Sequence, residues 1–472
     1  MTDLTSHPWF FCGIGGSGML PLALILKGAG AEVAGSDRSR DQGRTPEKFS
    51  WLESLGFTLF PQDGSGVHSA NQALIASAAV EDTVPEMVRA RDLGCPRMSR
   101  AELLARLFNA AGTRIALGGT SGKSTVTGMA GWIMDQAGRD PTIMNGAVMK
   151  NYVHADAPFA SARVGAASSG GGTFVSEVDE SDGSIALYNP TVAALLNVSL
   201  DHKSMEELRE LFGDFLARAD CAVVNFDDPE AAELAPMARC LISFAIDHSE
   251  AMIAVRAGSI NEGPTSLIAT IEDRRDCSAA ELNLKLPGRH NLANALAAIA
   301  ACNAAGVPVA EAVHALSSFA GLARRFDIVG TSAAGVTVID DFGHNPEKCA
   351  ATLKTLKAHP GRVIAFFQPH GYGPLRQMGH ELAETFAREL GPDDLTILCD
   401  PVYFGGTVDR SEGSERIVRL IGEHGGKAEY VPSREDCGAR IAAVAQPGDR
   451  IVIMGARDDT LSLFAKDLLA EV

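Results

Sequence analysis

The sequence predicts an α/β fold built from three successive units. Short apolar segments alternate with helical patterns along the chain, which is typical of parallel sheets covered by helices. Glycine-rich turns follow two of the predicted strands, at the place where α/β proteins hold phosphates. The length of 472 residues agrees with this, because it corresponds to roughly three domains at about 150 residues each.

Composition excludes several classes of protein. A hydrophobic fraction of 46% and a charged fraction of 21% are ordinary for globular proteins and exclude a disordered chain or a disulfide-rich miniprotein. The 41 basic and 59 acidic residues give a net charge of −18, which repels nucleic acid and anionic lipid. We therefore expect neither nucleic acid nor a membrane as a partner, although a local basic pocket could still bind a small anion. Small-molecule substrates and a monomer or homodimer are expected in addition.

Cysteine spacing and hydropathy indicate where such a protein works. The nine cysteines are far apart and form no C-x-x-C pair, so we expect reduced thiols rather than a zinc ribbon. The N-terminus does not resemble a signal peptide, and no apolar run is long enough to span a bilayer. These features predict a cytoplasmic enzyme.

The first unit begins with an apolar strand that runs into a glycine turn. Strands are predicted at Trp9–Ile14, Ala31–Asp37 and Gln72–Ser77, and helices at Met19–Lys27, Pro85–Leu93 and Ala101–Phe108. The turn from Gly13 to Gly18 fits G-x-G-x-x-G, and Asp37 ends the next strand, where a ribose-binding acid would lie. A nicotinamide or flavin dehydrogenase, a non-redox nucleotide site and a turn without ligand all fit this pattern.

The second unit carries a stronger motif between a strand and a helix. Strands are predicted at Arg114–Leu117, Phe174–Ser176 and Val192–Asn197, and helices at Val126–Ala137 and Asn291–Ala305. Amides of the turn Gly118–Thr125 would cradle phosphates, with the Lys123 ammonium on the β and γ oxygens and the Ser124 hydroxyl on Mg²⁺. Leu117 stands where the strict P-loop has glycine, so we predict an ATP site of a modified type.

An acidic run follows the middle strand of this unit. Glu177–Asp182 holds four carboxylates in six residues, which repel one another unless cations neutralise some of them. A magnesium site and a solvated acidic loop both fit the run. Asp201-His202 follows the strand that ends at Asn197, and a lone histidine there is more often structural than a ligand.

The third unit places polar residues after several strands. Strands are predicted at Val336–Asp340, Arg362–Gln368, Leu395–Asp400 and Arg450–Met454. The segments Asp340–Pro346, Gln368–His370 and Gly455–Asp459 follow three of them, which is typical of a ligand site. Arg324 and Arg325, at the start of the unit, suit a phosphate or a salt bridge between domains.

In this order the motifs resemble those of the Mur ligases, the ATP-dependent amide-forming enzymes of peptidoglycan precursor synthesis. The resemblance runs from about Phe10 to Phe464, and its signatures are Gly13–Met19, Gly119–Thr125, Glu177–Asp182, Pro287–Asn291, Arg324–Asp327, Asp340–Pro346 and Phe367–His370. It implies a Rossmann-like UDP-sugar-binding domain (1–110), a central P-loop-type domain for ATP and Mg²⁺ (111–322) and a Rossmann-like amino-acid-binding domain (323–472).

The resemblance also implies a reaction. The lactyl carboxylate of UDP-N-acetylmuramate would attack ATP, and the resulting acyl phosphate would take an amine, L-alanine or a related one. Attachment of a recycled murein peptide is a close second. Two Mg²⁺ ions are implied, with ligands Ser124, Glu177 and His202.

Site residues follow from the same resemblance. Catalysis is assigned to Lys123, Glu177, His202, Arg325 and His344. ATP is assigned to Gly119, Thr120, Ser121, Gly122, Lys123, Ser124, Thr125, His290, Asn291, Asn294, Arg324, Arg325, Asp340 and Asp341. The UDP-sugar is assigned to Gly15, Gly16, Ser17, Gly18, Met19, Ser36, Asp37, Ser77 and Asn145, and the amino acid to His370 and Arg376.

The chain departs from the family's usual motifs at the amino-acid side. The two arginines that usually follow the Phe-Gln-Pro-His segment are replaced by Gly371 and Pro374. Ser121 and Asn345 each stand in place of a usual histidine, and Phe342 in place of a tyrosine. We therefore expect an altered donor pocket, in which Arg376 holds the carboxylate or the amine is not L-alanine. A non-catalytic protein that binds the sugar nucleotide and ATP is the other interpretation.

Overall fold

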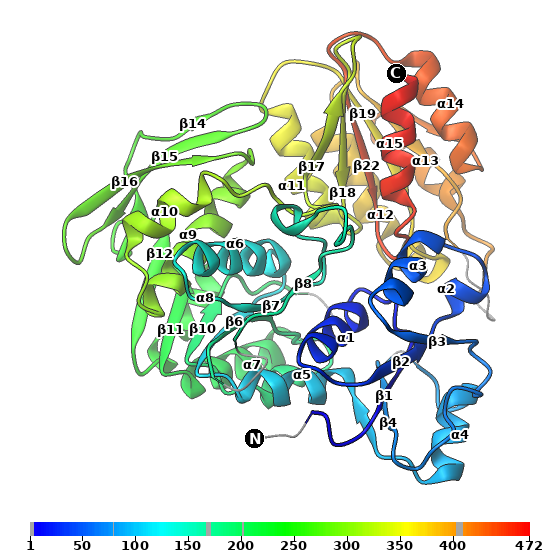
Figure 1. Ribbon diagram of the computed structural model, residues 1–472. Helices are drawn as coiled ribbons and strands as arrows, with labels where there is room; N and C mark the ends of the chain where they lie inside the picture. The colour runs from blue at the N-terminus through cyan, green and yellow to red at the C-terminus, as the bar shows by residue number, and fades with distance from the viewer. Residues whose placement is uncertain (1–3, 79, 167–170, 201–202, 403–408) are drawn as a thin grey trace. The chain divides into compact units, whose positions relative to one another are not determined.

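The chain forms two compact units in the computed structural model, which describes all residues except 1–3, 79, 167–170, 201–202 and 403–408 (Figure 1). Unit 1 comprises residues 1–261, 267–285 and 291–321, and unit 2 comprises residues 262–266, 286–290 and 322–472. Within the described residues no helix is long and apolar enough to cross a membrane.

A parallel sheet of five strands begins unit 1. Its strand order is β3-β2-β1-β4-β5, and every neighbouring pair is parallel. The strands are β1 (Trp9–Cys12), β2 (Val33–Ser36), β3 (Thr58–Phe60), β4 (Ala73–Ala76) and β5 (Arg97–Ser99). The helices are α1 (Met19–Gly28), α2 (Arg38–Asp41), α3 (Pro46–Ser54), α4 (Pro85–Leu93) and α5 (Arg100–Asn109). The strand–helix alternation predicted for this part is confirmed.

The second sheet of unit 1 has a parallel centre, β12-β11-β10-β6-β9-β7. Its strands are β6 (Thr113–Gly118), β7 (Thr142–Met144), β9 (Thr173–Glu177), β10 (Val192–Leu195), β11 (Cys221–Asn225) and β12 (Leu241–Ala245), with β8 (Ala162–Arg163) antiparallel beside β7. The helices are α6 (Lys123–Gln136), α7 (Met205–Arg218), α8 (Pro229–Leu234), α9 (Arg289–Ala304) and α10 (Val309–Leu316).

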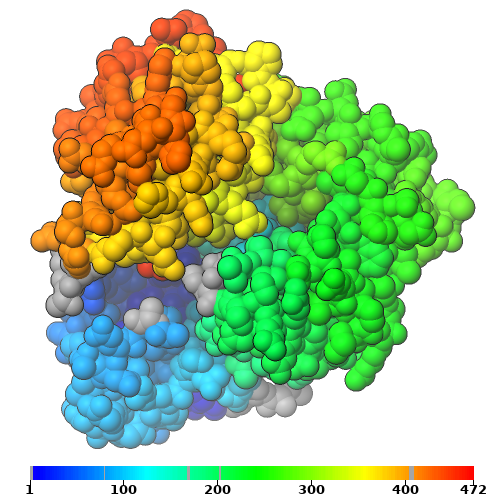
Figure 2. Space-filling model, turned by 180° about the vertical axis from the view of Figure 1, so that it is seen from behind, coloured from blue at the N-terminus to red at the C-terminus, as the bar shows by residue number. Residues whose placement is uncertain are grey.

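An antiparallel extension that the sequence patterns did not predict continues this sheet beyond β12. β13 (Ile253–Val255) pairs with β15 (Leu267–Asp273), which pairs with β16 (Ser278–Leu284), and β14 (Asn261–Glu262) lies between the first two in sequence. The hairpin of β15 and β16 lies at an outer edge of unit 1 (Figure 1), within the green part of the chain that Figure 2 shows from behind. Most β16 side chains are exposed, which explains why its sequence lacks a strong apolar pattern.

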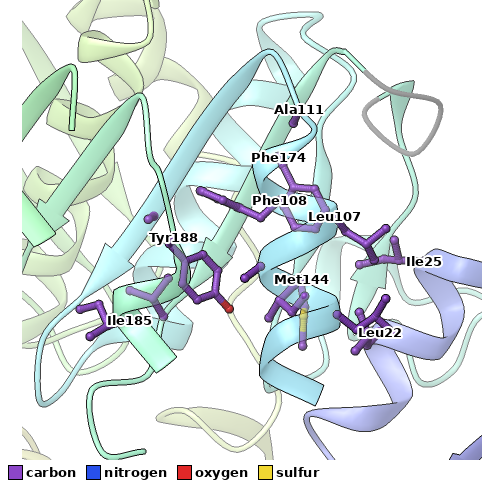
Figure 3. Packing of buried hydrophobic residues seen from close by; sticks show 14 of the residues in the cluster. Leu22, Ile25, Leu107, Phe108, Ala111, Met144, Phe174, Ile185 and Tyr188 are labelled. Carbon is purple, nitrogen blue, oxygen red and sulfur yellow. The ribbon is translucent and has the colours of Figure 1, made fainter. Parts of the chain in front are cut away.

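A shared core joins the two sheets of unit 1. Phe108 of α5 contacts Phe174 of β9 and Tyr188, with ring centroids 5.7 and 5.2 Å apart. Leu22 and Ile25 of α1 belong to the same cluster of buried side chains (Figure 3). The predicted boundary at residue 110 therefore falls beside a continuous hydrophobic core, and it stays a prediction.

Unit 2 is built on a sheet with the strand order β17-β18-β22-β19-β20-β21, parallel except for β17. The strands are β17 (Asp327–Thr331), β18 (Thr337–Asp341), β19 (Val363–Gln368), β20 (Leu395–Leu398), β21 (Ala428–Tyr430) and β22 (Arg450–Gly455). The helices are α11 (Pro346–Lys357), α12 (Tyr372–Glu389), α13 (Ser414–Glu423), α14 (Arg434–Val444) and α15 (Leu461–Glu471). Two hydrophobic clusters cover its faces, as expected for an α/β sheet.

All nine cysteines lie among the described residues, where they form no disulfide, and two of them are neighbours. Cys221 begins β11 and Cys240 directly precedes β12, and the Ala222 amide donates to the Cys240 carbonyl. Their sulfur atoms are 2.7 Å apart near the protein surface. The sequence, in which 18 residues separate them, gave no sign of this pair.

Candidate functional site

The phosphate turn after β6 has a backbone that requires glycine at two positions. Gly119 and Gly122 have φ angles of 139° and 84°, values that other residues rarely adopt. A Cβ atom on Gly122 would lie 2.6 Å from the Asn294 side-chain oxygen, and one on Gly119 would lie 3.1 Å from Leu196. Helix α6 begins at Lys123, so the amides of its first turn point toward the loop.

Asn197, at the end of β10, holds the tip of this turn. Its Oδ1 accepts hydrogen bonds of 2.9 Å from the Thr120 hydroxyl and from the Ser121 amide, and its Nδ2 donates to the Ser121 carbonyl at 3.2 Å. Asn197 was not among the site residues predicted from the sequence. An asparagine at the carboxyl end of the strand beside β6 was the available signal.

Lys123 and Ser124 each meet a carboxylate of the acidic run. Lys123 Nζ forms a 2.7 Å ion pair with Glu180 and donates to the Gly119 carbonyl at 2.6 Å. The Ser124 hydroxyl donates to Glu177 Oε2 at 2.7 Å, while Glu177 Oε1 accepts from the Gly146 amide at 2.7 Å. The run therefore lies against the phosphate turn and is not a solvated loop.

The remaining carboxylates of the run are also satisfied. Asp182 lies 3.8 Å from the Arg100 guanidinium, and Asp179 accepts a 2.7 Å hydrogen bond from the Ser181 hydroxyl. Lys123 and Arg100 thus neutralise part of the acidic charge, as the repulsion argument requires. Asn145, which we assigned to the UDP-sugar, is buried and donates to the Ser124 carbonyl at 2.9 Å.

The predicted metal ligands are brought together in part. Ser124 and Glu177 supply hydroxyl and carboxylate oxygens 2.7 Å apart, a donor set that suits Mg²⁺. His202, the third predicted ligand and a predicted catalytic residue, lies outside the described residues, as does Asp201. Across the described part of the chain, no group of three or more His, Cys, Asp or Glu side chains could hold a metal.

The glycine turn after β1 is braced by Asp37. Its Oδ2 accepts from the Gly15 amide and its Oδ1 from the Ser39 amide, both at 2.8 Å. Gly15 has no room for a side chain, because a Cβ atom would lie 2.9 Å from the Phe49 ring. The Ser36 hydroxyl donates to the buried Glu86.

The other predicted UDP-sugar residues lie along the same edge of the first sheet. Gly16 and Ser17 are exposed in the turn, Gly18 caps α1, Met19 begins that helix, and Ser77 follows β4. A Cβ atom on Gly18 would lie 3.0 Å from the Arg100 side chain. The glycine turn after β1 and the phosphate turn after β6 both belong to unit 1.

The first two turns of α9 carry three of the residues assigned to ATP. His290 is buried, its Nδ1 lies 3.4 Å from the Thr355 hydroxyl, and burial lowers the pKa of its imidazole. Asn291 is buried, and Asn294 lies beside Gly122 of the phosphate turn.

In unit 2, Arg324 connects the carboxyl ends of strands β18 and β22. Its guanidinium donates to the Gly455 carbonyl at 2.7 Å and the Asp458 carbonyl at 3.0 Å, and it lies 3.4 Å from Asp340. Burial raises the pKa of Asp340 to about 6, although Arg324 opposes this. Asp341 accepts hydrogen bonds from the Phe326 amide, the Gly343 amide and the Thr352 hydroxyl.

Arg325 lies differently from its neighbour. Its guanidinium carbon is 4.1 Å from the centre of the Phe342 ring, a cation–π contact. His344 meets the same ring edge-to-face at 5.4 Å, and its Nδ1 lies 2.9 Å from the Phe342 carbonyl. Phe342, one of the departures from the family pattern, therefore serves as a platform for Arg325 and His344.

The two residues assigned to the amino acid, His370 and Arg376, have different neighbours. His370 meets His344 edge-to-face at 5.1 Å, and burial lowers the pKa of the two imidazoles to about 4 and 3. The Arg376 guanidinium instead donates to the Asp409 carbonyl at 2.7 Å and lies 3.5 Å from its carboxylate. The Arg376 guanidinium is therefore already paired with the exposed Asp409.

The folds and the phosphate turn define a nucleotide-binding α/β protein of the phosphate-loop class. Family models match the chain in order: the Mur ligase family catalytic domain at residues 10–111, the Mur ligase middle domain at 117–302, and the Mur ligase glutamate ligase domain at 324–457. The chain belongs to the Mur ligase family, and it is accordingly an ATP-dependent ligase. The three matched segments confirm the predicted three-domain architecture.

Curated relatives agree with this assignment, and solved structures agree with the fold. UDP-N-acetylmuramate–L-alanine ligases of Phenylobacterium zucineum and Agrobacterium fabrum are each 35% identical to the chain, covering 97% and 95% of it and 94% of their own lengths. The UDP-N-acetylmuramate-alanine ligase structure from Thermotoga maritima superposes with a TM-score of 0.79 at 24% identity, covering 98% of both chains. The murein peptide ligase structure from Psychrobacter arcticus has a TM-score of 0.71 at 23% identity and the same coverage.

Proposed function

We propose that this protein joins the lactyl carboxylate of UDP-N-acetylmuramate to the amine of an amino acid, in peptidoglycan precursor synthesis. The observation that carries the proposal is the phosphate turn, where Lys123 and the Ser124–Glu177 pair converge at the end of β6. The names of the curated relatives supply the substrate class.

The reaction has two steps. In the first, a carboxylate oxygen attacks the γ-phosphorus of ATP, the bond to the β-phosphate oxygen breaks, and ADP leaves. In the second, the amine nitrogen attacks the acyl carbon, inorganic phosphate leaves with the bonding electrons, and the amine loses a proton. Both reactants of the first step are anions, so positive charge at the phosphates lowers its barrier.

This chain's own residues supply part of that charge. Lys123, now paired with Glu180, would bind the phosphate oxygens when the nucleotide enters. Ser124 and Glu177 would hold Mg²⁺, which neutralises phosphate charge when bound. Asn197 fixes the tip of the turn through the Thr120 hydroxyl and the Ser121 amide, which leaves the first amides of α6 to face the phosphates.

The glycine turn of the first sheet is proposed to hold the UDP. The turn follows a buried strand and precedes the N-terminus of α1, the arrangement that binds a pyrophosphate. Asp37 keeps the turn in shape through its bonds to Gly15 and Ser39. Absence of nicotinamide binding, together with UDP-sugar binding, would remove the dehydrogenase interpretation.

A substrate panel tests the proposal. The full chain, UDP-N-acetylmuramate, ATP and Mg²⁺ are incubated with each of the proteinogenic amino acids and with a murein tripeptide, and phosphate release is measured. We expect release that depends on both the sugar nucleotide and an amine, and Lys123→Ala should abolish it. Unchanged turnover in Lys123→Ala would contradict the assignment of the phosphate turn, and absence of release with every amine would favour a non-catalytic binding protein.

The same panel decides between an amino acid and a peptide donor. Replacement of the usual arginines by Gly371 and Pro374 favours a donor other than L-alanine, the murein peptide included. Turnover with L-alanine at least as efficient as with every competitor would defeat the hypothesis of an altered pocket.

A further inference from the structure

The donor side of unit 2 has lost the cations expected there. Gly371 has a φ angle of 145°, which disfavours any side chain, and a Cβ atom on it would lie 3.6 Å from Pro374. Arg376 is held by Asp409 in an exposed loop. A donor carboxylate would therefore need a cation from another part of the sheet.

Strand register brings one candidate to the same edge. β18, β22 and β19 are adjacent and parallel, with Asp341 opposite Met454 and Gln368 opposite Gly455. Arg457 lies two residues beyond Gly455, as His370 lies two residues beyond Gln368. Side chains that follow neighbouring parallel strands meet at the carboxyl edge of the sheet, where α/β proteins bind ligands.

Arg457 has an unusual backbone for its residue type. Its φ angle is 60°, in the left-handed region where glycine is favoured and a long side chain costs free energy. Residues held in this region cluster at ligand sites. The strain does not serve a contact inside the described part of the protein, because the exposed Arg457 guanidinium makes no hydrogen bond or ion pair there.

Two cations lie close to the imidazoles at this edge, where the Asp458 carboxylate beside Arg457 is paired with Arg434. Arg457 and Lys348, together with the larger effect of burial, lower the pKa of His370. Lys348 also lowers the pKa of His344, whose ring is 5.1 Å from that of His370. Two cations and two neutral rings at one sheet edge form a site for an anion.

We propose that Arg457 binds the carboxylate of the incoming amine donor, with Lys348 and His370 beside it. Arg457 thereby takes the part of the arginines replaced at positions 371 and 374. A guanidinium can hold both oxygens of a carboxylate in a planar, bidentate pair, which selects a donor that carries one. The inference rests on the proposed function, because it names the residue that selects the donor in that reaction.

A comparison of a donor with its amide tests the inference. L-alanine and L-alaninamide, or the best donor of the panel and its amide, are compared in KM and kcat for the wild type, Arg457→Gly, Arg457→Lys and Arg376→Ala. Arg419→Ala, an exposed arginine of α13, is the control. We expect the wild type to prefer the carboxylate, and Arg457→Gly to raise its KM about 10- to 100-fold while KM for the amide changes little.

The melting temperature of Arg457→Gly and the activity of Arg457→Lys distinguish carboxylate binding by Arg457 from a purely structural role. Glycine suits the backbone at position 457, so the melting temperature of Arg457→Gly should equal or exceed that of the wild type. Arg457→Lys should recover part of the preference for the carboxylate. An unchanged KM ratio in Arg457→Gly, or a ratio that collapses in Arg376→Ala instead, would overturn the inference and leave the ligase reaction intact. Absence of turnover by the wild type with every donor would overturn both.

Discussion

The Ser124 hydroxyl and the Glu177 carboxylate share a 2.7 Å hydrogen bond at the foot of the phosphate turn. The two residues are 53 positions apart in sequence, on α6 and β9, and they meet because β9 is paired with β6, the strand that precedes α6. The bond explains how the acidic run and the glycine turn, separate motifs in the sequence, form one site. The role of the Glu177 charge in binding Mg²⁺ can therefore be tested by a single substitution.

Glu177→Gln is expected to remove the effect of magnesium on nucleotide binding. The amide retains the shape and the bond to the Gly146 amide, but it loses the charge that attracts a divalent cation. The melting temperature is measured with ADP in the presence and absence of Mg²⁺. The magnesium-dependent part of the shift should vanish in Glu177→Gln and persist in Asp182→Asn, in the same acidic run. An equal shift in both variants would rule out Glu177 as a ligand.

Asn197→Ala is expected to loosen the phosphate turn. It removes the acceptor of the Thr120 hydroxyl and the Ser121 amide, which should cost about 1–3 kcal/mol in free energy of unfolding and weaken ATP binding. Asn197→Asp keeps the acceptor but adds a negative charge near the phosphates. It should therefore retain more stability than the alanine variant and still bind ATP weakly. Urea denaturation and calorimetric titration measure the two effects, and wild-type values for Asn197→Ala would contradict the prediction.

His344 is expected to make stability fall with acid. Its pKa in the folded protein is about 3, because burial, Lys348, His370 and Arg325 all disfavour the charged imidazole. Since the ordinary value is 6.5, the folded state keeps the neutral ring, and stability is full above pH 6.5 and is lost as the pH falls toward 3. The loss is at most about 1.4 kcal/mol per pH unit. His344→Asn should flatten the curve of urea midpoints between pH 7 and 5, and an identical curve would refute the effect.

Mild oxidation is expected to join Cys221 and Cys240. Adjacent strands bring the two sulfur atoms within 2.7 Å, and the strand spacing suits disulfide geometry. Hydrogen peroxide would oxidise the exposed Cys240 to a sulfenic acid with release of water, and the Cys221 thiol would displace a second water to form the disulfide. Peptide mapping without reductant should find the cross-linked pair. Both thiols remaining open to alkylation while the exposed Cys277 is oxidised would contradict this.

Most strands and helices near the site could be predicted, because glycine turns mark the ends of buried apolar strands. The turn at Gly119–Thr125 and the acidic run are local in sequence, and their physical chemistry is local too. Asn197, Glu180 and Arg457 could not be assigned roles in the same way. Their roles depend on strand order and register, which set the neighbours of each strand end and cannot be read from one strand's own residues.

Hydropathy patterns also failed to predict the hairpin of β15 and β16. Only alternate residues of β15 are buried, and β16 is largely exposed, so neither has the continuous apolar run of a central strand. Arg376 shows a third limit, since its position beside the replaced arginines suggested a substitute, whereas the fold directs it to Asp409.

The two sheets of unit 1 are proposed to bind different substrates, but the hydrophobic core under α5 makes them a single folding unit. A fragment starting at residue 111 would lose Phe108 and expose Phe174 and Tyr188 to water, so it should fold poorly alone although it contains the whole phosphate turn. The sheet that is proposed to hold the sugar nucleotide therefore also acts as an intramolecular scaffold for the sheet that is proposed to hold ATP. Exchange of the first sheet between related ligases would succeed only if α5 and its aromatic contacts were transferred with it.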